Sequence, residues 1–264
     1  MLTATQSDTA LKRERWAILG ALAVVAALAW VYTAHLVSTA QDMMMMDSAM
    51  SQMRPWGGAE IALMFAMWAV MMVAMMLPTV APAALLFVTI QRNQREPRVV
   101  RLRLTAFLFG YLAIWIGFAA LATAGQWGLH TISLSPSLLS AGPILGGALL
   151  VGAGLFQWAP LKRACLAHCR SPQSFFTTEW REGLSGAWQM GLKHGLHCVG
   201  GCWLLMSLLF LTGTMNLLWM AVLTVFVLVE KVAPRGEWVS RAGGVLLAGA
   251  GLWIIVGAAI LLPR

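Results

Sequence analysis

The chain has few charged residues, and acidic residues are the scarcer kind. Only 11% of its 264 residues are charged, and 10 acidic side chains stand against 18 basic ones. A soluble domain is usually about a quarter charged, so this composition excludes an ordinary soluble protein. Hydrophobic residues make up 59% of the chain, and apolar runs of about 20 residues, long enough to cross a bilayer, recur along it. We therefore expect an all-α, polytopic membrane protein.

Enzyme and nucleotide-binding signatures are also missing. The chain contains no Walker A loop, no dinucleotide fingerprint, no nucleophile elbow and no His-Glu-x-x-His sequence. No connection between apolar runs is long enough to form a soluble domain, which excludes a cytosolic ATPase unit. We expect a single integral membrane domain over residues 1–264, with the lipid bilayer as a partner. No catalytic residue stands out, and no nucleic-acid partner is expected.

Seven apolar runs are candidate membrane spans. They cover residues 16–37, 60–90, 104–128, 142–159, 191–211, 216–232 and 242–262. The second run is overlong and contains Pro78 and Pro82, which predicts a kink or a tilt. The first run is longer than the apolar core of a signal peptide, so we expect it to be an uncleaved anchor.

The basic residues predict the orientation, because Lys and Arg concentrate on the cytoplasmic side of membrane proteins. With seven spans and a cytoplasmic N-terminus, 16 of the 18 basic residues fall in cytoplasmic segments. Only Arg54 and Arg264 then face outward. We expect a multi-pass protein of the bacterial cytoplasmic (inner) membrane, with its N-terminus inside and its C-terminus outside.

Cysteine and histidine are concentrated in two short clusters, at residues 165–169 and 194–202. All four cysteines and three of the five histidines lie within these 38 positions. The members are Cys165, His168, Cys169, His194, His197, Cys198 and Cys202. Intramembrane histidine is rare and usually functional, so the clusters indicate metal binding or thiol redox chemistry. The alternative is inert packing.

The spacing within each cluster suits a metal site. Residues i and i+4 share one face of a helix, which aligns His194 with Cys198 and Cys198 with Cys202. Cys165 and Cys169 repeat this interval, and we place them on a loop that follows the inner end of the fourth span. Both clusters open toward the cytoplasm, where thiols stay reduced, so structural disulfides are disfavoured. Three small residues leave room for a neighbouring segment to approach: Gly195, Gly200 and Gly201.

Methionine is unusually abundant, with 17 residues distributed unevenly. The predicted outer loop contains Met43, Met44, Met45, Met46, Met50 and Met53. A stripe on the second span contains Met64, Met67, Met71 and Met75, flanked by Met72 and Met76. Thioethers are soft ligands that suit Cu(I), so the outer loop and the stripe form a candidate metal path, by analogy with eukaryotic copper-uptake channels. Methionine is also a common packing residue, which is the favoured interpretation of the stripe alone.

Two further patterns predict local structure near the inner surface. Glu230 and Lys231 are neighbours at the end of the sixth span, and we interpret them as an interfacial ion pair, with a role in proton or ion passage as the alternative. Aromatic and apolar residues at four-residue intervals join the two clusters: Phe176, Trp180, Leu184 and Trp188. This spacing predicts a helix lying in the inner interface, with an ordinary short connector as the alternative.

At these motifs the chain resembles a bacterial family of predicted metal-binding integral membrane proteins, a domain of unknown function. The resemblance covers about residues 55–260. It is carried by residues 160–172, residues 194–206, the Glu230-Lys231 pair and the methionine-rich residues 67–78. It implies metal binding but no established substrate or reaction. The family often has two adjacent cysteines where this chain has Gly201-Cys202, which implies either that His197 replaces a ligand or that the site is weaker.

The leading hypothesis is a cytoplasm-facing Cys/His site for a soft or borderline transition metal, with Cu(I) favoured and Zn(II) second. Cys165, Cys169, Cys198 and Cys202 would be thiolate ligands, with the histidines as alternative ligands or as groups that tune the metal. The task would be metal transport, or delivery to a soluble metal-binding partner protein. One alternative is a membrane thiol–disulfide electron carrier with a redox partner, although Cys-x-x-x-Cys spacing is less typical of it. Another is a structural or assembly subunit of a membrane complex.

Overall fold

The computed structural model describes residues 4–46, 57–92, 96–133, 142–212 and 216–261, and all regular structure in these residues is helical. The elements are α1 (Ala4–Met46), α2 (Gly58–Met76), the 3-10 turn η2 (Pro78–Val80), α3 (Ala81–Arg92), α4 (Pro97–Ser133), α6 (Gly142–Phe156), α7 (Pro160–Arg170), α8 (Pro172–Glu179), α9 (Gly183–Ser207), α10 (Leu209–Thr212), α11 (Leu217–Val232) and α12 (Gly236–Leu261). The all-helical expectation is confirmed for these residues.

Four helical stretches are long and apolar enough to cross a membrane: Arg15–Thr39, Gly58–Gln91, Pro97–Thr131 and Gly236–Ile260. The α6 and α7 helices also qualify when they are taken together as one span bent by 61°. Neither α9 nor α11 belongs to this set, because α11 has only 16 residues and α9 carries several polar side chains. The described residues therefore contain four or five candidate spans, and the expected number of seven stays a prediction.

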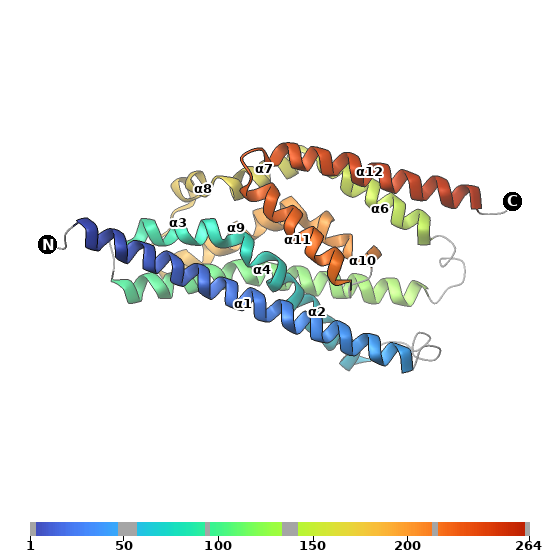
Figure 1. The fold of residues 1–264 in the computed structure, drawn as a ribbon, viewed down its shortest axis with the longest axis horizontal. Helices are drawn as coiled ribbons and strands as arrows, with labels where there is room; N and C mark the ends of the chain where they lie inside the picture. Colours follow the sequence, from blue (N-terminus) through green and yellow to red (C-terminus); the bar gives the residue numbers. More distant parts are fainter. Residues whose placement is uncertain (1–3, 47–56, 93–95, 134–141, 213–215, 262–264) are drawn as a thin grey trace.

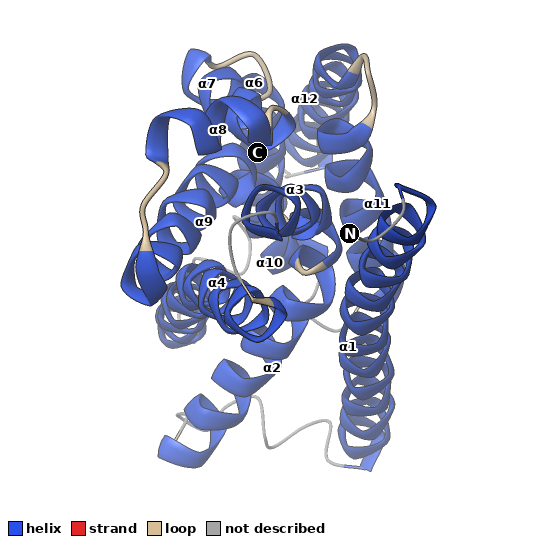
Figure 2. Cartoon of the chain, turned by 90° about the vertical axis from the view of Figure 1, so that its left-hand side faces the viewer, coloured by secondary structure: helices blue, strands red, loops and turns tan. Residues whose placement is uncertain are grey.

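The long helices run back and forth along one axis of the molecule (Figure 1). The N-terminus and the start of α4 lie at one end of this axis, and α8, α7 and the turn between α11 and α12 lie between that end and the middle. The starts of α2 and α6, the end of α4 and the C-terminus lie toward the other end. Viewed from the N-terminal end, α6, α7 and α12 form one side of the bundle, away from α1 (Figure 2).

The predicted irregularity of the second span is present at its prolines. Pro78 lacks an amide hydrogen, so the α-helical hydrogen-bond ladder is interrupted there. The η2 turn takes its place, and the backbone N–H of Val80 donates to Leu77 O over 3.4 Å. The helical stretch nevertheless continues from Gly58 to Gln91. This region buries Thr79 beside the end of α2.

Glycine lets α4 and α9 pack closely enough to bring their side chains together. A Cβ atom added at Gly191 would lie 2.0 Å from Phe107 O, and one added at Gly110 would lie 2.3 Å from Trp188 O. One added at Gly195 would lie 3.0 Å from side-chain atoms of Ile114. The expectation that Gly195 leaves room for a neighbouring helix is confirmed, because backbones approach this closely only where Cβ is missing.

The segment between the two clusters differs from the expected single helix. The α8 helix ends at Glu179, and α9 begins at Gly183, where φ is +85°. Phe176 is buried, whereas Leu184 and Trp188 are exposed. The four-residue repeat therefore does not form one continuous face, because the chain breaks between its second and third members.

Candidate thiol and histidine site

The two cysteine clusters come together where α7 packs on α9. The first cluster lies on the α7 helix, which corrects the expected loop; Pro160 begins the helix at a position where a missing amide hydrogen has no cost. The thiols of Cys169 and Cys202 both interact with the sulfur of Cys198. The Cys202 thiol also donates to Cys198 O over 2.9 Å. All four cysteines are free, and Cys198 and Cys202 are buried.

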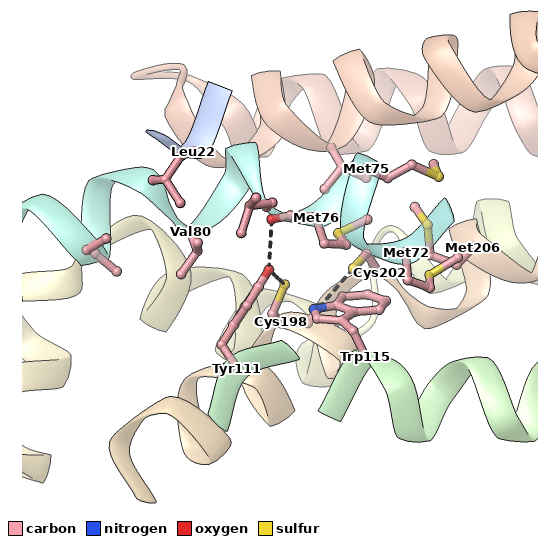
Figure 3. Close-up of a cluster of buried hydrophobic side chains, with 14 of the residues drawn as sticks. Leu22, Met72, Met75, Met76, Val80, Tyr111, Trp115, Cys198, Cys202 and Met206 are labelled. Atoms are coloured by element: carbon pink, nitrogen blue, oxygen red, sulfur yellow. Dashed lines mark hydrogen bonds between the residues drawn. The ribbon is translucent and has the colours of Figure 1, made fainter. Parts of the chain in front are cut away.

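Cys198 has polar neighbours from two further elements, α11 and α4. Lys231 Nζ of α11 donates to Cys198 Sγ over 2.8 Å and to Thr79 Oγ1 over 3.1 Å. The Tyr111 hydroxyl of α4 lies 3.1 Å from Cys198 Sγ and donates to Met76 O over 3.2 Å (Figure 3). An adjacent ammonium stabilises a thiolate, so this site favours a charged sulfur at Cys198.

The expected ion pair between Glu230 and Lys231 is absent. Consecutive residues point about 100° apart on a helix, so they do not face each other. Glu230 accepts hydrogen bonds from Lys162 Nζ over 2.8 Å and from Ser240 Oγ over 2.7 Å. Lys231 faces Cys198 instead. Sequence reasoning assigned Lys231 to a different partner and missed Tyr111 and Lys162. The available signal was a lysine close to the apolar part of a span.

Two histidines stack at the junction of α7 and α9. The rings of His168 and His197 lie 4.3 Å apart between centroids, with an interplanar angle of 28°. His168 Nδ1 bonds to Ala164 O over 2.8 Å, and His197 Nδ1 bonds to Lys193 O over 2.7 Å. A carbonyl oxygen only accepts, so each Nδ1 carries the hydrogen. Nε2 is therefore the nitrogen with a free lone pair in each neutral ring.

His194 has a different environment from the other two histidines. Its side chain is buried among the aromatic rings of Phe107, Tyr111 and Phe175, with centroid distances of 5.9, 5.8 and 5.3 Å. Its Nδ1 atom is buried without a hydrogen-bond partner. His194 thus lies one turn before Cys198, as the spacing predicts, but its ring packs on aromatic side chains.

Cys165 packs against the glycines of α9. A Cβ atom added at Gly200 would lie 2.7 Å from Cys165 Sγ, and one added at Gly201 would lie 3.7 Å from Cys165 Cβ. The close approach expected at these glycines is confirmed. The Gly201 position faces α7, and an added side-chain carbon there would make ordinary contact. Cys165 is half-buried and lies where α7 packs on α9.

Methionine side chains pack in the same buried cluster as the thiols. Met72, Met76 and Met206 belong to the buried cluster that contains Cys198 and Cys202, and Figure 3 shows Met72 and Met206 beside Cys202. Met75 points away from Cys202 in the same view. The buried core therefore places thioethers and thiols in one cluster.

The other predicted methionines fall into two groups: those with buried side chains and those with side chains outside the described part of the chain. Met67 and Met71 are buried in the same core as Met75. The backbone of Met43, Met44, Met45 and Met46 forms the end of α1. The side chains of these four residues lie outside the part that the structure describes, as do Met50 and Met53 entirely.

The donors do not form a preassembled metal cage. Among the described residues, no group of three or more His, Cys, Asp or Glu side chains is arranged to hold a metal ion. The Lys231 ammonium instead occupies the position beside the Cys198 sulfur. The donor set is still chemically soft, since it combines thiols with nearby thioethers, which suits Cu(I) better than a hard cation.

A comparison with known families extends this description. The family model PpoB2, described as a copper chaperone, matches residues 65–254. No curated protein and no solved structure matches the chain. The matched region includes both cysteine clusters and Lys231. It confirms the expected relation to metals, and it replaces a family without known function by one with copper in its description. The chain belongs to the PpoB2 copper chaperone family.

Proposed function

We propose that this protein is an integral membrane copper chaperone that carries Cu(I) as cargo on the Cys198 and Cys202 sulfurs and delivers it to a partner protein. The family description supports copper as the metal. The oxidation state follows from the ligands, because thiolates and thioethers are the donors that select Cu(I).

The observation that carries the proposal is the grouping of two thiols and one ammonium around the Cys198 sulfur. A buried charge needs a compensating charge nearby. In the metal-free protein the Cys198 thiolate and the Lys231 ammonium cancel. When Cu(I) binds to Cys198 and Cys202, the second thiol loses its proton, and the bis-thiolate complex carries one negative charge. Lys231 balances that charge, so loading leaves the buried site neutral.

The same charge balance disfavours Zn(II), the second candidate. Zn(II) on two thiolates would be neutral, and the adjacent Lys231 would then be a buried charge without a counter-ion. Uncompensated buried charges are strongly destabilising. A third thiolate from Cys169 would restore neutrality, so zinc requires all three sulfurs where copper requires two.

The stacked histidines suit a transfer step at the rim of the site. His168 and His197 are half-buried, whereas Cys198 is buried. Each Nε2 atom is available as a ligand, and neutral imidazole is a common ligand for copper. We assign this pair to the capture or release of the ion. His194 is assigned to packing beside the thiols.

The membrane location and orientation are part of the proposal. Apolar helices long enough to span a bilayer support insertion. The short or polar helices α11 and α9 would complete seven passes, with their polar side chains inside the bundle. Lys and Arg favour the cytoplasmic side, and α4, α7 and α12 carry theirs toward the N-terminal end. The N-terminus would therefore be cytoplasmic, and the site would open to the cytoplasm.

A thiol–disulfide carrier fits the structure less well. Exchange requires a partner thiol to reach a sulfur atom directly. Cys198 is 1% exposed and Cys202 is 2% exposed, so a protein thiol has no access to either in this conformation. A small ion that enters between α7 and α9 does not face this restriction.

Metal content tests the proposal. The protein would be purified under reducing conditions, loaded with Cu(I) and measured by elemental analysis. Cys198→Ser and Cys202→Ser should lose most of the bound copper. Cys165→Ser is the matched control, and it should retain copper because Cys165 lies outside the thiol group around Cys198. Equal copper content in the wild type and the Cys198→Ser variant would refute the proposed site.

A further inference from the structure

A second polar site lies away from the thiols, between α7 and α12. A cavity of about 360 Å³ opens there, beside the residues that join α6 to α7. Its walls include Gln157, Lys162, Arg163, Glu237, Ser240 and Arg241. None of these residues belongs to the proposed copper site, so the cavity is separate from that site.

The inner wall of the cavity is a closed, neutral network. Lys162 Nζ donates to both carboxylate oxygens of Glu230, over 2.8 and 3.0 Å, and also to Gln157 Oε1. Ser240 Oγ donates to Glu230 Oε1. Lys162 and Glu230 are both about 1% exposed, so their charges cancel within the protein. The charge of Glu230 is therefore compensated by Lys162 in this wall.

Gln157 has a donor that no described residue satisfies. Its side chain is only 2% exposed, and its Oε1 atom is held by Lys162. That bond fixes the amide orientation, because Lys162 can only donate. The amide nitrogen Nε2 is buried without a hydrogen-bond partner. Buried donors in native proteins are nearly always satisfied, so Gln157, which lines the cavity, lacks an acceptor for its amide nitrogen.

The rim of the cavity is positively charged. Arg163 and Arg241 are exposed there, against the single carboxylate of Glu237. Arginine presents a planar fork of donors that matches the oxygens of a phosphate group. Arg241 also lies over the ring of Trp238, with its guanidinium carbon 5.5 Å from the ring centroid. Exposed tryptophan next to basic residues is typical of the headgroup level of a membrane.

We infer that this cavity binds a phosphate-bearing anion, with Gln157, Arg163 and Arg241 as its donors. A phosphate offers several acceptor oxygens and a negative charge, which meets both the unsatisfied amide and the surplus of positive charge. Basic pockets between helices at the cytoplasmic side of membranes bind lipid headgroups of this chemistry. The phosphate can belong to an anionic lipid or to a free phosphate, and the two sources give different results in one experiment.

The test is binding by the full-length protein in detergent. The probes are phosphatidylglycerol, phosphatidylcholine and inorganic phosphate, each titrated and measured by native mass spectrometry. The Arg163→Gln/Arg241→Gln double variant should weaken phosphatidylglycerol binding by about tenfold or more, because charge-assisted hydrogen bonds are lost. Arg98→Gln is the matched control, since Arg98 is an exposed arginine on α4 outside the cavity. This variant should bind phosphatidylglycerol as tightly as the wild type does.

A second variant tests the buried donor. Gln157→Glu has nearly the same shape, keeps an acceptor for Lys162 and adds a negative charge, so it should also weaken anion binding. Phosphatidylglycerol binding without phosphate binding identifies a lipid site, and binding of both identifies a general phosphate site. If neither probe binds, or if the cavity variants bind as the Arg98→Gln control does, the inference is wrong. Copper content should be unchanged in all of these variants, which separates this result from the fate of the proposed copper site.

Discussion

Lys231 Nζ lies 2.8 Å from the sulfur of Cys198, although the two residues are 33 positions apart on different helices. Lys231 also donates to Thr79, so its ammonium lies between Cys198 of α9 and Thr79 of η2. A buried lysine held against a cysteine is the feature that gives this site a defined charge. The first prediction follows from it.

Replacing Lys231 should weaken copper binding. Lys231→Met keeps much of the side-chain length but leaves the bis-thiolate complex with an unbalanced negative charge. Groups that support metal ligands typically contribute about 10–100-fold in affinity, and we expect a loss in that range. Competition with a chromophoric Cu(I) chelator measures it. Lys193→Met is the control, because Lys193 pairs with Glu179 over 2.5 Å and does not contact the thiols. Equal affinities in the two variants would contradict the role of Lys231.

Tyr111→Phe should lower stability while keeping the aromatic packing. The hydroxyl lies 3.1 Å from both Cys198 Sγ and Thr79 Oγ1, and its removal leaves these buried groups with fewer partners. The expected loss in the free energy of unfolding is about 1–3 kcal/mol. Thermal unfolding in detergent checks this. Tyr32→Phe, at an exposed tyrosine, should cost nothing measurable.

Gly191→Ala should disrupt the contact between α4 and α9. The added Cβ atom would lie 2.0 Å from the backbone oxygen of Phe107, which cannot move without shifting α4. Overpacking of this kind typically costs about 1–3 kcal/mol and occasionally more. Gly117→Ala is the matched control on α4, since an added Cβ atom there meets nothing within 4 Å. A fall in melting temperature for Gly191→Ala alone would support the close approach; equal temperatures for both would contradict it.

The buried pair of Lys162 and Glu230 should show strong coupling. Removing either partner alone leaves an uncompensated buried charge, which typically costs about 3–5 kcal/mol. Lys162→Met and Glu230→Gln should each destabilise strongly, and the double variant should recover part of the loss. A double-mutant cycle on unfolding free energies measures this coupling. If the losses of unfolding free energy in the two single variants simply add in the double variant, Lys162 and Glu230 do not interact as a pair.

The ion pair between Glu179 and Lys193 predicts a small pH dependence. The hydrogen bond from Lys193 lowers the pKa of the Glu179 carboxyl below its usual value. A depressed folded-state pKa contributes stability above the unfolded-state pKa, and this stability is lost as the pH falls through the folded-state pKa. Glu179→Gln should therefore reduce stability at pH 7, by less than about 1 kcal/mol because the pair is half-exposed. At about pH 3 the variant and the wild type should unfold at temperatures closer together. A constant difference at both pH values would exclude this linkage.

Sequence patterns predicted the parts of this molecule that depend on local spacing. The four-residue interval correctly places Cys198 and Cys202 on one helix and brings their side chains together. Glycine at positions 195, 200 and 201 predicted close approach, because its missing Cβ atom is a property of the residue itself. The apolar runs predicted an all-helical chain, because the length and composition of a run are also local properties of the sequence.

The contacts around Cys198 could not be predicted in this way. Lys231 and Tyr111 reach the sulfur from other helices, and no periodicity relates their positions to the cysteine. The neighbours Glu230 and Lys231 suggested a local pair, but the helix points them in different directions, to Lys162 and to Cys198.

X-ray absorption at the copper edge tests the central claim most directly. The loaded wild-type protein should show Cu(I) with at least two sulfur ligands, and Cys198→Ser should lose this sulfur shell while Cys165→Ser keeps it. A copper environment made only of nitrogen and oxygen, or a sulfur shell unchanged in Cys198→Ser, would contradict binding at these buried thiols.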